Sequence, residues 1–247
     1  MEGRLRSGFL TAEAHADATL QDQARAVIPL AAICARAREE DEGDSGQPPL
    51  DRRMLRGLLR WFKHEFFSWV DAPPCEVTGS PTKPAGMAQP THEERSWGAS
   101  RVEIYRNPRT GHITRFPRYN HPGKLLSTRR GRCGEWANCF CLCARAVGFE
   151  ARWVLDVTDH VWCEVHLEGR WHHCDPCECA LDAPLMYERG WGKRLSYVFA
   201  FNEYEVTDVT KRYALRWSDT LSRLVGEVKL AKALRSVHDS HVELPVE

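Results

Sequence analysis

Three residues far apart in the sequence, a cysteine, a histidine and an aspartate, have the types and order of a nucleophilic acyl-transfer site. Cys133 follows Gly131 and Arg132 and opens a stretch with helical spacing. A helix N-terminus and neighbouring cations both favour a thiolate over a thiol. His160 and Asp175 each lie in a later strand-like run. In such a site the histidine takes the thiol proton and the aspartate orients the ring. We therefore take Cys133, His160 and Asp175 as the candidate catalytic residues.

Two strand-like runs, 160–167 and 170–175, flank a Glu-Gly pair and predict a β-hairpin. In the register set by that turn, His160 and Asp175 are diagonal neighbours, about 7–8 Å apart at Cα. A slip of one residue would reverse the two faces. Other histidines and aspartates compete for the same roles, namely His166, His172, His173, Asp156 and Asp159. The predicted register favours His160 with Asp175.

A set of helices and strands must position these residues. Apolar residues recur at intervals of four, three and four between residues 136 and 147, which predicts a helix over 133–147. We expect further helices over 18–40 (interrupted at Pro29), 50–70 and 219–236, strands over 101–105, 151–157, 195–201 and 205–210, and irregular chain over 71–100 and 107–131. Helices followed by a helix and antiparallel strands predict an α+β fold.

Composition limits the classes of protein to which this chain can belong. The 247 residues are 43% hydrophobic, which is enough for a full core, and Lys+Arg and Asp+Glu are both 34. Zero net charge argues against strong nonspecific attraction to nucleic acid or acidic membranes. The sequence lacks both a membrane-spanning apolar run and a signal peptide. Ten cysteines in such a chain are expected to be reduced thiols. We expect a soluble, cytoplasmic protein, with the nucleus as a second location.

Several motifs together resemble one enzyme family. GRCGEWANCF (131–140), DVTDHVWCEV (156–165) and WHHCDPCE (171–178) are similar to the core motifs of cytoplasmic peptide:N-glycanase, in the transglutaminase-like superfamily. The resemblance extends through TRFPRYN (114–120), WFKHEFFSWV (61–70), GWGKRLSYVFAF (190–201) and DVTKRY (208–213). It aligns the family's catalytic residues with Cys133, His160 and Asp175. It implies a papain-like cysteine hydrolase core, in which the helix carrying the nucleophile packs on an antiparallel sheet with flanking helices.

The resemblance also implies a reaction and its substrates. Cys133 would attack the side-chain amide of a glycosylated asparagine in a misfolded protein or glycopeptide, release the glycan and leave a thioester for water to hydrolyse. Trp69 would lie near the cleft and contribute to the oxyanion site. Glu164, Trp171 and Glu178 would bind the inner sugars of the glycan. Proteasome shuttle factors would be partners, whereas nucleic acid and membranes would not.

The family's structural zinc site is the place where the resemblance breaks down. Its four cysteine positions are occupied here by Cys75, Thr78, Asn107 and Thr110. Hydroxyl and amide groups do not replace thiolates in a tetrahedral zinc site. We therefore expect neither zinc nor any other cofactor, and a lobe over 71–115 that is held together in another way. The cysteine clusters at 139–143 and 174–179 are expected to be core and near-core thiols, not metal ligands.

The sequence divides into three parts with a central catalytic core. Residues 1–49 are expected to form a helical extension and linker, 50–213 the transglutaminase-like core, and 214–247 a C-terminal helix and tail. Two alternatives to a deglycosylating amidase stay open. One is an inactive scaffold or binding protein on the same fold, favoured by the lost zinc ligands. The other is a transglutaminase or peptidase, which would have the same three catalytic residues.

Overall fold

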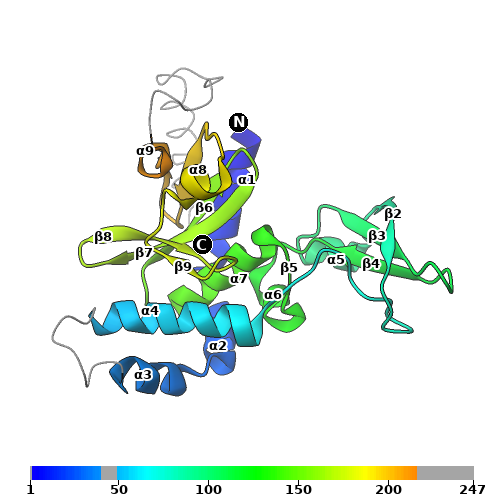
Figure 1. Cartoon of the computed structure of the whole chain (residues 1–247), viewed down its shortest axis with the longest axis horizontal. Coiled ribbons are helices and arrows are strands. Elements are labelled where there is room, and N and C mark those ends of the chain that lie inside the picture. The colour runs from blue at the N-terminus through cyan, green and yellow to red at the C-terminus, as the bar shows by residue number, and fades with distance from the viewer. Residues whose placement is uncertain (1, 40–48, 216–247) are drawn as a thin grey trace, which may run out of the picture.

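The computed structural model describes residues 2–39 and 49–215, and within them the central feature is a six-stranded antiparallel sheet (Figure 1). Its strand order is β11-β10-β6-β7-β8-β9. The strands are β6 (Ala151–Asp156), β7 (His160–Leu167), β8 (Arg170–Asp175), β9 (Ala180–Leu181), β10 (Val198–Phe201) and β11 (Val206–Asp208). This arrangement of helices and antiparallel strands confirms the α+β class.

The hairpin formed by β7 and β8 has the register that the sequence predicts. Leu167 pairs with Arg170 and Cys163 pairs with Cys174. Glu168 and Gly169 both have positive φ, 53° and 74°, as a two-residue hairpin turn of the right twist requires. Because the turn fixes the pairing, every side chain of the two strands has a fixed face of the sheet.

Both faces of this sheet are covered. Odd-numbered residues of β7, from Val161 to Leu167, join the main hydrophobic core beneath helix α7 (Cys133–Ala146). Even-numbered residues such as Trp162 face a second, smaller core formed with α8 (Met186–Trp191) and α9 (Thr210–Tyr213). The face that carries His160 is therefore covered for much of its length by these two short helices.

Helix α7 is buried on nearly all sides, which explains its high content of small and apolar residues. Its residues from Glu135 to Ala144 are all buried. The Cys163 thiol of β7 donates to the carbonyl oxygen of Ala137, at a distance of 3.2 Å. The helix that the sequence predicts over 133–147 is thus confirmed, and it packs directly on the central strands.

The N-terminal helices share the main core. They are α1 (Glu2–Ala14), α2 (Ala18–Val27), α3 (Leu30–Glu39) and α4 (Leu50–Trp61). Leu5, Phe9 and Ile33 from these helices lie in the same cluster as the residues of α7. The predicted break at Pro29 separates α2 from α3. Helix α1 has weak apolar periodicity and was not predicted as a separate helix, although residues 1–49 were expected to form a helical extension.

The predicted helix over 50–70 ends earlier than expected. After α4, residues Phe62–Phe66 continue as one π-helical turn, and the chain then extends as β1 (Ser68–Trp69). Strand β1 pairs in parallel with β5 (Arg130–Gly131), the residues that lead into α7. Strand β10 confirms most of the strand expected over 195–201, and β11 part of that over 205–210. The helix expected over 219–236 lies outside the described residues.

A separate three-stranded sheet projects to one side of the main body (Figure 1). It contains β2 (Lys83–Ala88), β3 (Val102–Arg106) and β4 (Ile113–Pro117), with the short helix α5 (His92–Ser96) before β3. Helix α6 (Pro122–Thr128) leads back to the core. The expectation of irregular chain over 71–100 and 107–131 was wrong at β2, α5, β4, β5 and α6, whereas the strand expected at 101–105 is confirmed as β3.

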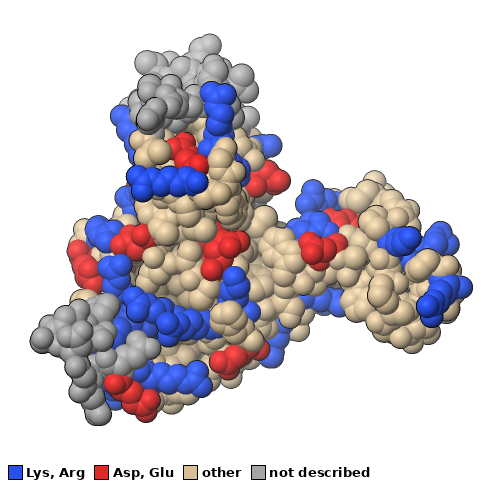
Figure 2. All heavy atoms as spheres, viewed as in Figure 1, with Lys and Arg blue, Asp and Glu red and all other residues tan. Residues whose placement is uncertain are grey.

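The surface has a mixed charge. Figure 2 shows acidic and basic side chains interspersed over the face in view, as expected for a chain with a formal net charge of zero. Within residues 2–39 and 49–215, no helix combines the length and the apolar character needed to cross a bilayer.

Candidate active site

Cys133 is the first residue of α7 and is partly accessible to solvent. The first N–H groups of a helix have no intrahelical acceptor, so they point toward the space in front of it. The Arg132 backbone N–H is an exception, because it donates to the Glu135 carboxylate at 3.0 Å. The Arg132 guanidinium is paired with Glu103, at 2.7 Å. The candidate nucleophile thus begins a helix whose N-terminus is fixed by charged groups on both sides.

His160 and Asp175 meet as the hairpin register predicts. The Nε2 atom of His160 lies 2.9 Å from Oδ2 of Asp175, and both residues are buried. Burial lowers the pKa of His160, but hydrogen bonds to Asp175 and to Cys133 outweigh it and raise that pKa to about 9. Because Nε2 is bonded to Asp175, the Nδ1 atom is the one left to face the thiol. The structure therefore brings Cys133, His160 and Asp175 together in one row.

The Asp175 carboxylate is held in place through both of its oxygens. Oδ1 accepts hydrogen bonds from the backbone N–H groups of Cys177 and Glu178, at 2.8 and 3.3 Å. Oδ2 accepts the hydroxyl proton of Tyr187 at 2.9 Å, in addition to its bond with His160. Burial raises the pKa of Asp175, but these donors, with His160 first, bring it below its usual value. The carboxylate is therefore ionised although it has no exposed surface.

Helix α8 contributes two aromatic rings that were not among the predicted site residues. The ring centroids of Tyr187 and Trp191 lie 5.2 and 4.9 Å from that of His160, both edge-on. Trp191 is 47% exposed and Tyr187 is fully buried. The motif GWGKRLSYVFAF, which begins at residue 190, was the available signal for Trp191, and no such signal marked Tyr187.

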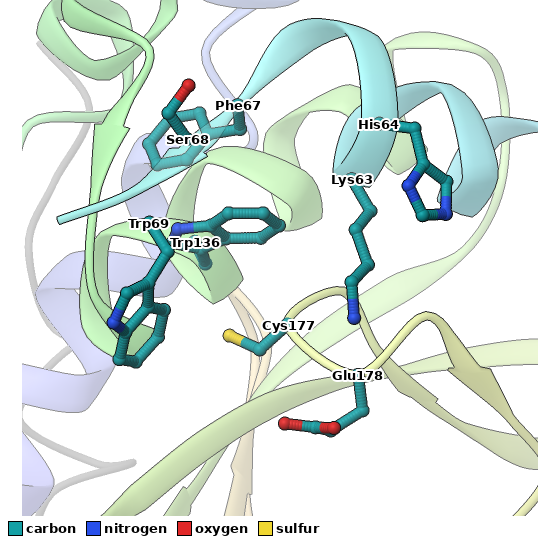
Figure 3. A pocket seen from close by; sticks show the side chains of 8 residues that line it. All are labelled: Lys63, His64, Phe67, Ser68, Trp69, Trp136, Cys177 and Glu178. Carbon is teal, nitrogen blue, oxygen red and sulfur yellow. The ribbon is translucent and has the colours of Figure 1, made fainter.

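A cavity of about 520 Å³ lies beside the start of α7 (Figure 3). Trp136, one turn along α7 from Cys133, lines it, and so does Cys177, whose thiol is coupled electrostatically to Cys133. The remaining lining residues are Lys63, His64, Phe67, Ser68, Trp69 and Glu178. In Figure 3 the two tryptophans stand on one side, and the turn with Cys177 and Glu178 stands opposite. The cavity is therefore a cleft next to the nucleophile.

Trp69 lies in the wall of this cleft, where the sequence places it. Its side chain is 48% exposed, and its ring centroid lies 6.4 Å from that of Trp136. The indole N–H donates to the Asp71 carboxylate at 2.8 Å. In this conformation the donor is therefore occupied, and a contribution of Trp69 to oxyanion binding stays a prediction.

The three residues expected to contact sugar lie in two different places. Glu178 is exposed and lines the cleft. Glu164 has no exposed surface; Arg152 contacts its carboxylate at 2.6 Å and the Tyr213 hydroxyl donates to it at 2.7 Å. Trp171 is partly buried, and the Arg152 guanidinium lies 4.0 Å from its ring centroid. The structure thus groups Glu164 and Trp171 around Arg152, apart from the residues that line the cleft.

The four positions that hold zinc-binding cysteines in the resembled family lie in the lobe formed by residues 71–115, called the side lobe below. Here they are Cys75, Thr78, Asn107 and Thr110, and hydrogen bonds link them. The Asn107 amide donates to the hydroxyls of Thr78 and Ser80, at 3.0 and 2.8 Å, and accepts the backbone N–H groups of Arg109 and Thr110. Hydrogen bonds from Thr78 and Asn107 lower the pKa of the Cys75 thiol to about 7.

One thiol, two hydroxyls and an amide do not fit a four-thiolate zinc site, because they lack the soft anionic donors that zinc requires there. Several of the polar atoms also already serve one another as partners. Across the described part of the chain, histidine, cysteine and acidic side chains nowhere gather in the groups of three that a metal ion would need.

Comparison with protein families identifies the type of domain. The profile of the transglutaminase-like superfamily matches residues 82–176. This range contains Cys133, His160 and Asp175, and it spans most of the side lobe, helix α7 and the β7–β8 hairpin. The match agrees with the arrangement of a helix that carries a nucleophile on an antiparallel sheet.

Individual curated relatives share nearly half of their aligned residues with this chain. The chain is 46% identical to the peptide-N(4)-(N-acetyl-beta-glucosaminyl)asparagine amidase of Gallus gallus, over 91% of this chain and 36% of the relative. Enzymes of the same name from Arabidopsis thaliana and Homo sapiens are 43% and 48% identical, over 96% and 83% of this chain and 34% and 32% of the relatives. The chain therefore spans about a third of the length of these relatives.

Solved structures support the fold alone. The crystal structure of Rad4-Rad23 bound to a 6-4 photoproduct UV lesion matches with a TM-score of 0.56 and 17% identity, over 98% of this chain and 55% of that chain. Rad4-Rad23 crosslinked to an undamaged DNA matches with a TM-score of 0.53 and 16% identity, over all of this chain and 54% of the other.

Proposed function

Because this chain belongs to the transglutaminase-like superfamily and is homologous to the peptide-N(4)-(N-acetyl-beta-glucosaminyl)asparagine amidases, we propose that it is an amidase that removes N-linked glycans from proteins. The observation that carries the proposal is the row of Cys133, His160 and Asp175 beside a cleft. We infer the substrate class from the name of the relatives, and the reaction type from the arrangement of the three residues.

The first half of the proposed reaction forms a thioester. The Cys133 sulfur, with its proton on His160, attacks the side-chain amide carbon of the glycosylated asparagine. The carbonyl oxygen then carries negative charge, which the free N–H groups at the start of α7 are placed to stabilise. His160 gives its proton to the amide nitrogen, the carbon–nitrogen bond breaks, and the glycan leaves as a glycosylamine. A thioester to Cys133 remains.

The second half uses water. Neutral His160 takes a proton from a water molecule, whose oxygen attacks the thioester carbon. The carbon–sulfur bond breaks, Cys133 is restored, and the peptide leaves with aspartate in place of asparagine. Asp175 contributes by keeping the His160 ring in one orientation through both steps, because its own oxygens are fixed by backbone and side-chain donors.

The residues that line the cleft are suited to bind a substrate that carries carbohydrate. Trp69, which is about half exposed, offers an aromatic surface, while Lys63 and Glu178 offer groups that hydrogen-bond to sugar hydroxyls. A catalytically inactive scaffold is less favoured, because burial and four hydrogen-bond donors around an ionised Asp175 are what an active acid–base pair requires. A transglutaminase or peptidase would use the same row of residues, so only the reaction product separates these activities.

Incubation of the protein with a denatured high-mannose glycoprotein in heavy-oxygen water tests the proposal. We expect release of the glycan, with heavy oxygen in the new aspartate side chain, measured by mass spectrometry. Cys133→Ala should abolish release while the chain stays folded by circular dichroism. Cys34→Ala, which alters another partly buried thiol far along the chain in α3, should release glycan at the wild-type rate.

The wild-type result decides between the alternatives. A folded wild-type protein that leaves the glycan in place would favour the scaffold. Cleavage or cross-linking of the polypeptide without glycan release would favour a peptidase or a transglutaminase.

We also propose that the side lobe is held by hydrogen bonds around Asn107 in place of zinc. Asn107 is 1% exposed and its amide takes part in four hydrogen bonds. Asn107→Leu should destabilise the lobe by about 1–3 kcal/mol, because a buried amide and the four part-buried hydrogen bonds that it makes are lost together. Hydrogen exchange of β3 and β4 measures this, with the exposed Arg109→Ala as control. One tightly bound zinc per purified chain would contradict the proposal.

The cellular setting forms the last part of the proposal. All ten cysteines are free thiols, which fits a reducing compartment such as the cytoplasm. Glycoproteins that have been unfolded are the proposed substrates, and association with proteasome shuttle factors is proposed from the resemblance alone. Fractionation and co-purification of the tagged chain test these two points.

A further inference from the structure

A second row of hydrogen-bonded residues lies behind the His160–Asp175 pair and ends inside the protein. The Tyr187 hydroxyl of α8 lies 2.9 Å from Oδ2 of Asp175. His173 of β8 lies behind it, with Nε2 at 2.7 Å from the Tyr187 oxygen. Tyr187, His173 and Asp175 are each at most 1% exposed. None of the catalytic steps described above moves a proton to or from Tyr187 or His173.

The protons of this row can be placed from the partners of His173. The backbone N–H of Ala183 points at Nδ1 of His173, at 3.3 Å, so Nδ1 acts as the acceptor. The ring proton then lies on Nε2 and is donated to the Tyr187 oxygen. Burial lowers the pKa of His173 to about 4, so the ring is neutral at physiological pH. The Tyr187 hydroxyl proton is thereby directed to Asp175.

The two donors on Oδ2 of Asp175 have different chemical characters. His160 is a charged donor when protonated, whereas Tyr187 is a neutral donor, because burial first and the Asp175 charge second raise its pKa. A buried carboxylate that had lost the neutral donor would depend on His160 alone. Tyr187 therefore limits how strongly Asp175 holds the imidazolium and fixes the direction in which the carboxylate faces.

Tyr187 itself has little freedom to move. Its ring lies against Trp162, with 4.5 Å between centroids, and contacts His160 edge-on. Helix α8 ends at Gly192, whose φ of 63° lets the chain turn back at once toward β10. The hydroxyl is thus presented to Asp175 by packing, and the hydrogen bond does not depend on a mobile side chain.

We propose that Tyr187 and His173 are positioning residues of the active site, which orient the Asp175 carboxylate and through it hold the His160 ring toward Cys133. The proposal deepens the proposed amidase function and rests on it for the role of the site in catalysis. The hydrogen-bond geometry carries it, and neither residue touches the cleft that receives substrate.

Other titratable groups around the pair do not compete with this row. The groups that face His160 or Asp175 are Cys133 from α7, Cys163 from β7, His173 and Cys174 from β8, Cys177 from the following turn and Tyr187 from α8. Asp156 of β6 is the ladder partner of His160, and its carboxylate is paired with Lys193 at 2.6 Å. Burial raises the pKa of the Cys163, Cys174 and Cys177 thiols, so these stay neutral. Tyr187 and Cys133 are left as the neighbours that shape the behaviour of the pair.

The test uses Tyr187→Phe in the full chain, with Tyr213→Phe as matched control. Tyr213 is equally buried in the same small core, but its hydroxyl bonds to Glu164 instead of Asp175. Two readouts need no glycoprotein: the rate of Cys133 alkylation by iodoacetamide at neutral pH, and the titration of His160 followed by nitrogen-15 NMR. They report on the site even if the deglycosylation assay fails.

In Tyr187→Phe we expect alkylation to slow about 10- to 100-fold, because the ring is less well oriented. We expect the His160 titration midpoint to move to higher pH, because the carboxylate that lost a neutral donor binds the imidazolium more strongly. Simple loosening of the site would move that midpoint down toward the value of a free histidine. A fall or no change in the midpoint would overturn the proposal, as would the same change in Tyr213→Phe.

Variants of His173 keep the proposal testable if Tyr187→Phe does not fold. His173→Leu removes the donor to Tyr187 and should move the His160 midpoint in the same upward direction. His173→Gln, whose amide nitrogen can replace Nε2 as the donor, should restore the wild-type midpoint. Equal behaviour of the Leu and Gln variants would contradict a role for His173 in this row.

Discussion

The pair of His160 and Asp175 determines, at the scale of single residues, how the site responds to pH. The folded-state pKa of His160 is raised from 6.5 to about 9, so the stabilisation from its charge is complete below 6.5 and is lost as pH rises through 9. The pKa of Asp175 is lowered from 3.8, so its contribution is present above that value and is lost as pH falls through the folded-state pKa. The charged pair is therefore favoured between these limits.

Asp175→Asn tests this reading of the pair. The variant keeps the shape of the side chain but removes the charge, so the His160 pKa should fall. The alkaline loss of amidase activity, which needs the His160 proton, should then begin at lower pH, and Cys133 alkylation at neutral pH should slow because less imidazolium stabilises the thiolate. Amidase activity at neutral pH should drop by about 100- to 10,000-fold, the usual range for a lost acid–base arrangement. The measurement is a full pH profile of both rates. An unchanged alkaline limb would show that Asp175 does not control His160.

The positions of Cys133, His160 and Asp175 could be predicted because local rules determine them. Cys133 begins a helix with a clear apolar period, and a two-residue turn fixes His160 against Asp175. Glu164 shows the limit of such rules. Its face of the strand was correctly predicted, but Tyr213, which covers it, comes from 49 residues further along the chain. Contacts of that kind depend on the tertiary fold and leave no local pattern.

At the scale of elements, the short strand β5 before α7 packs so closely against Glu135 that residue 131 has no room for a side chain. A Cβ at Gly131 would lie 2.7 Å from Cγ of Glu135, and even closer to its Cβ. Glu135 cannot move freely, because it bonds to the Arg132 backbone and to Arg118. Gly134, three positions later, has open space where a Cβ would be.

This contrast gives a prediction with its own control. Gly131→Ala should destabilise the protein by about 1–3 kcal/mol, the usual cost of overpacking. Gly134→Ala should leave stability unchanged or raise it by up to about 1 kcal/mol, because alanine favours the helix. Urea unfolding measures both variants. Equal stabilities would mean that the start of α7 adjusts freely and that the glycine is not required there.

Prediction of elements failed where the local sequence opposes the structure. Strand β2 contains Pro84 and Gly86 and is exposed almost throughout, so it has neither the composition nor the alternation of a strand. It exists because it pairs with β3 across a bulge. The π-helical turn at 62–66 was also not foreseen, since helical periodicity continued through it in the sequence.

At the scale of the whole molecule, the N-terminal helices complete the main core. Phe9 of α1 is 1% exposed and lies in the cluster that contains α7, and His15 bonds to Asn138 of α7 at 2.7 Å. Gly8 lies so close to the ring of Phe201 that a Cβ there would come within 2.6 Å of it. Helix α1 is therefore packed closely against both α7 and β10.

Phe9→Ala should accordingly lower the free energy of unfolding of the entire fold by about 3–5 kcal/mol. Leu10→Ala is the control, because the neighbouring Leu10 is 60% exposed, and its loss should cost less than about 0.5 kcal/mol. Tryptophan fluorescence, which reports on the sheet and the cleft, follows unfolding in urea. If α1 were an independent appendage, the Phe9 variant would unfold with the wild-type midpoint.

The pairing of β1 with β5 has a mechanical consequence for access to the nucleophile. Trp69 is the ladder partner of Gly131, and the backbone N–H of Val70 donates to the Gly131 carbonyl oxygen at 3.0 Å. The side of the cleft that carries Trp69 and the backbone that leads into Cys133 are therefore joined as one rigid unit. The cleft beside Cys133 can therefore widen only through movement on its other side, where Cys177 and Glu178 lie.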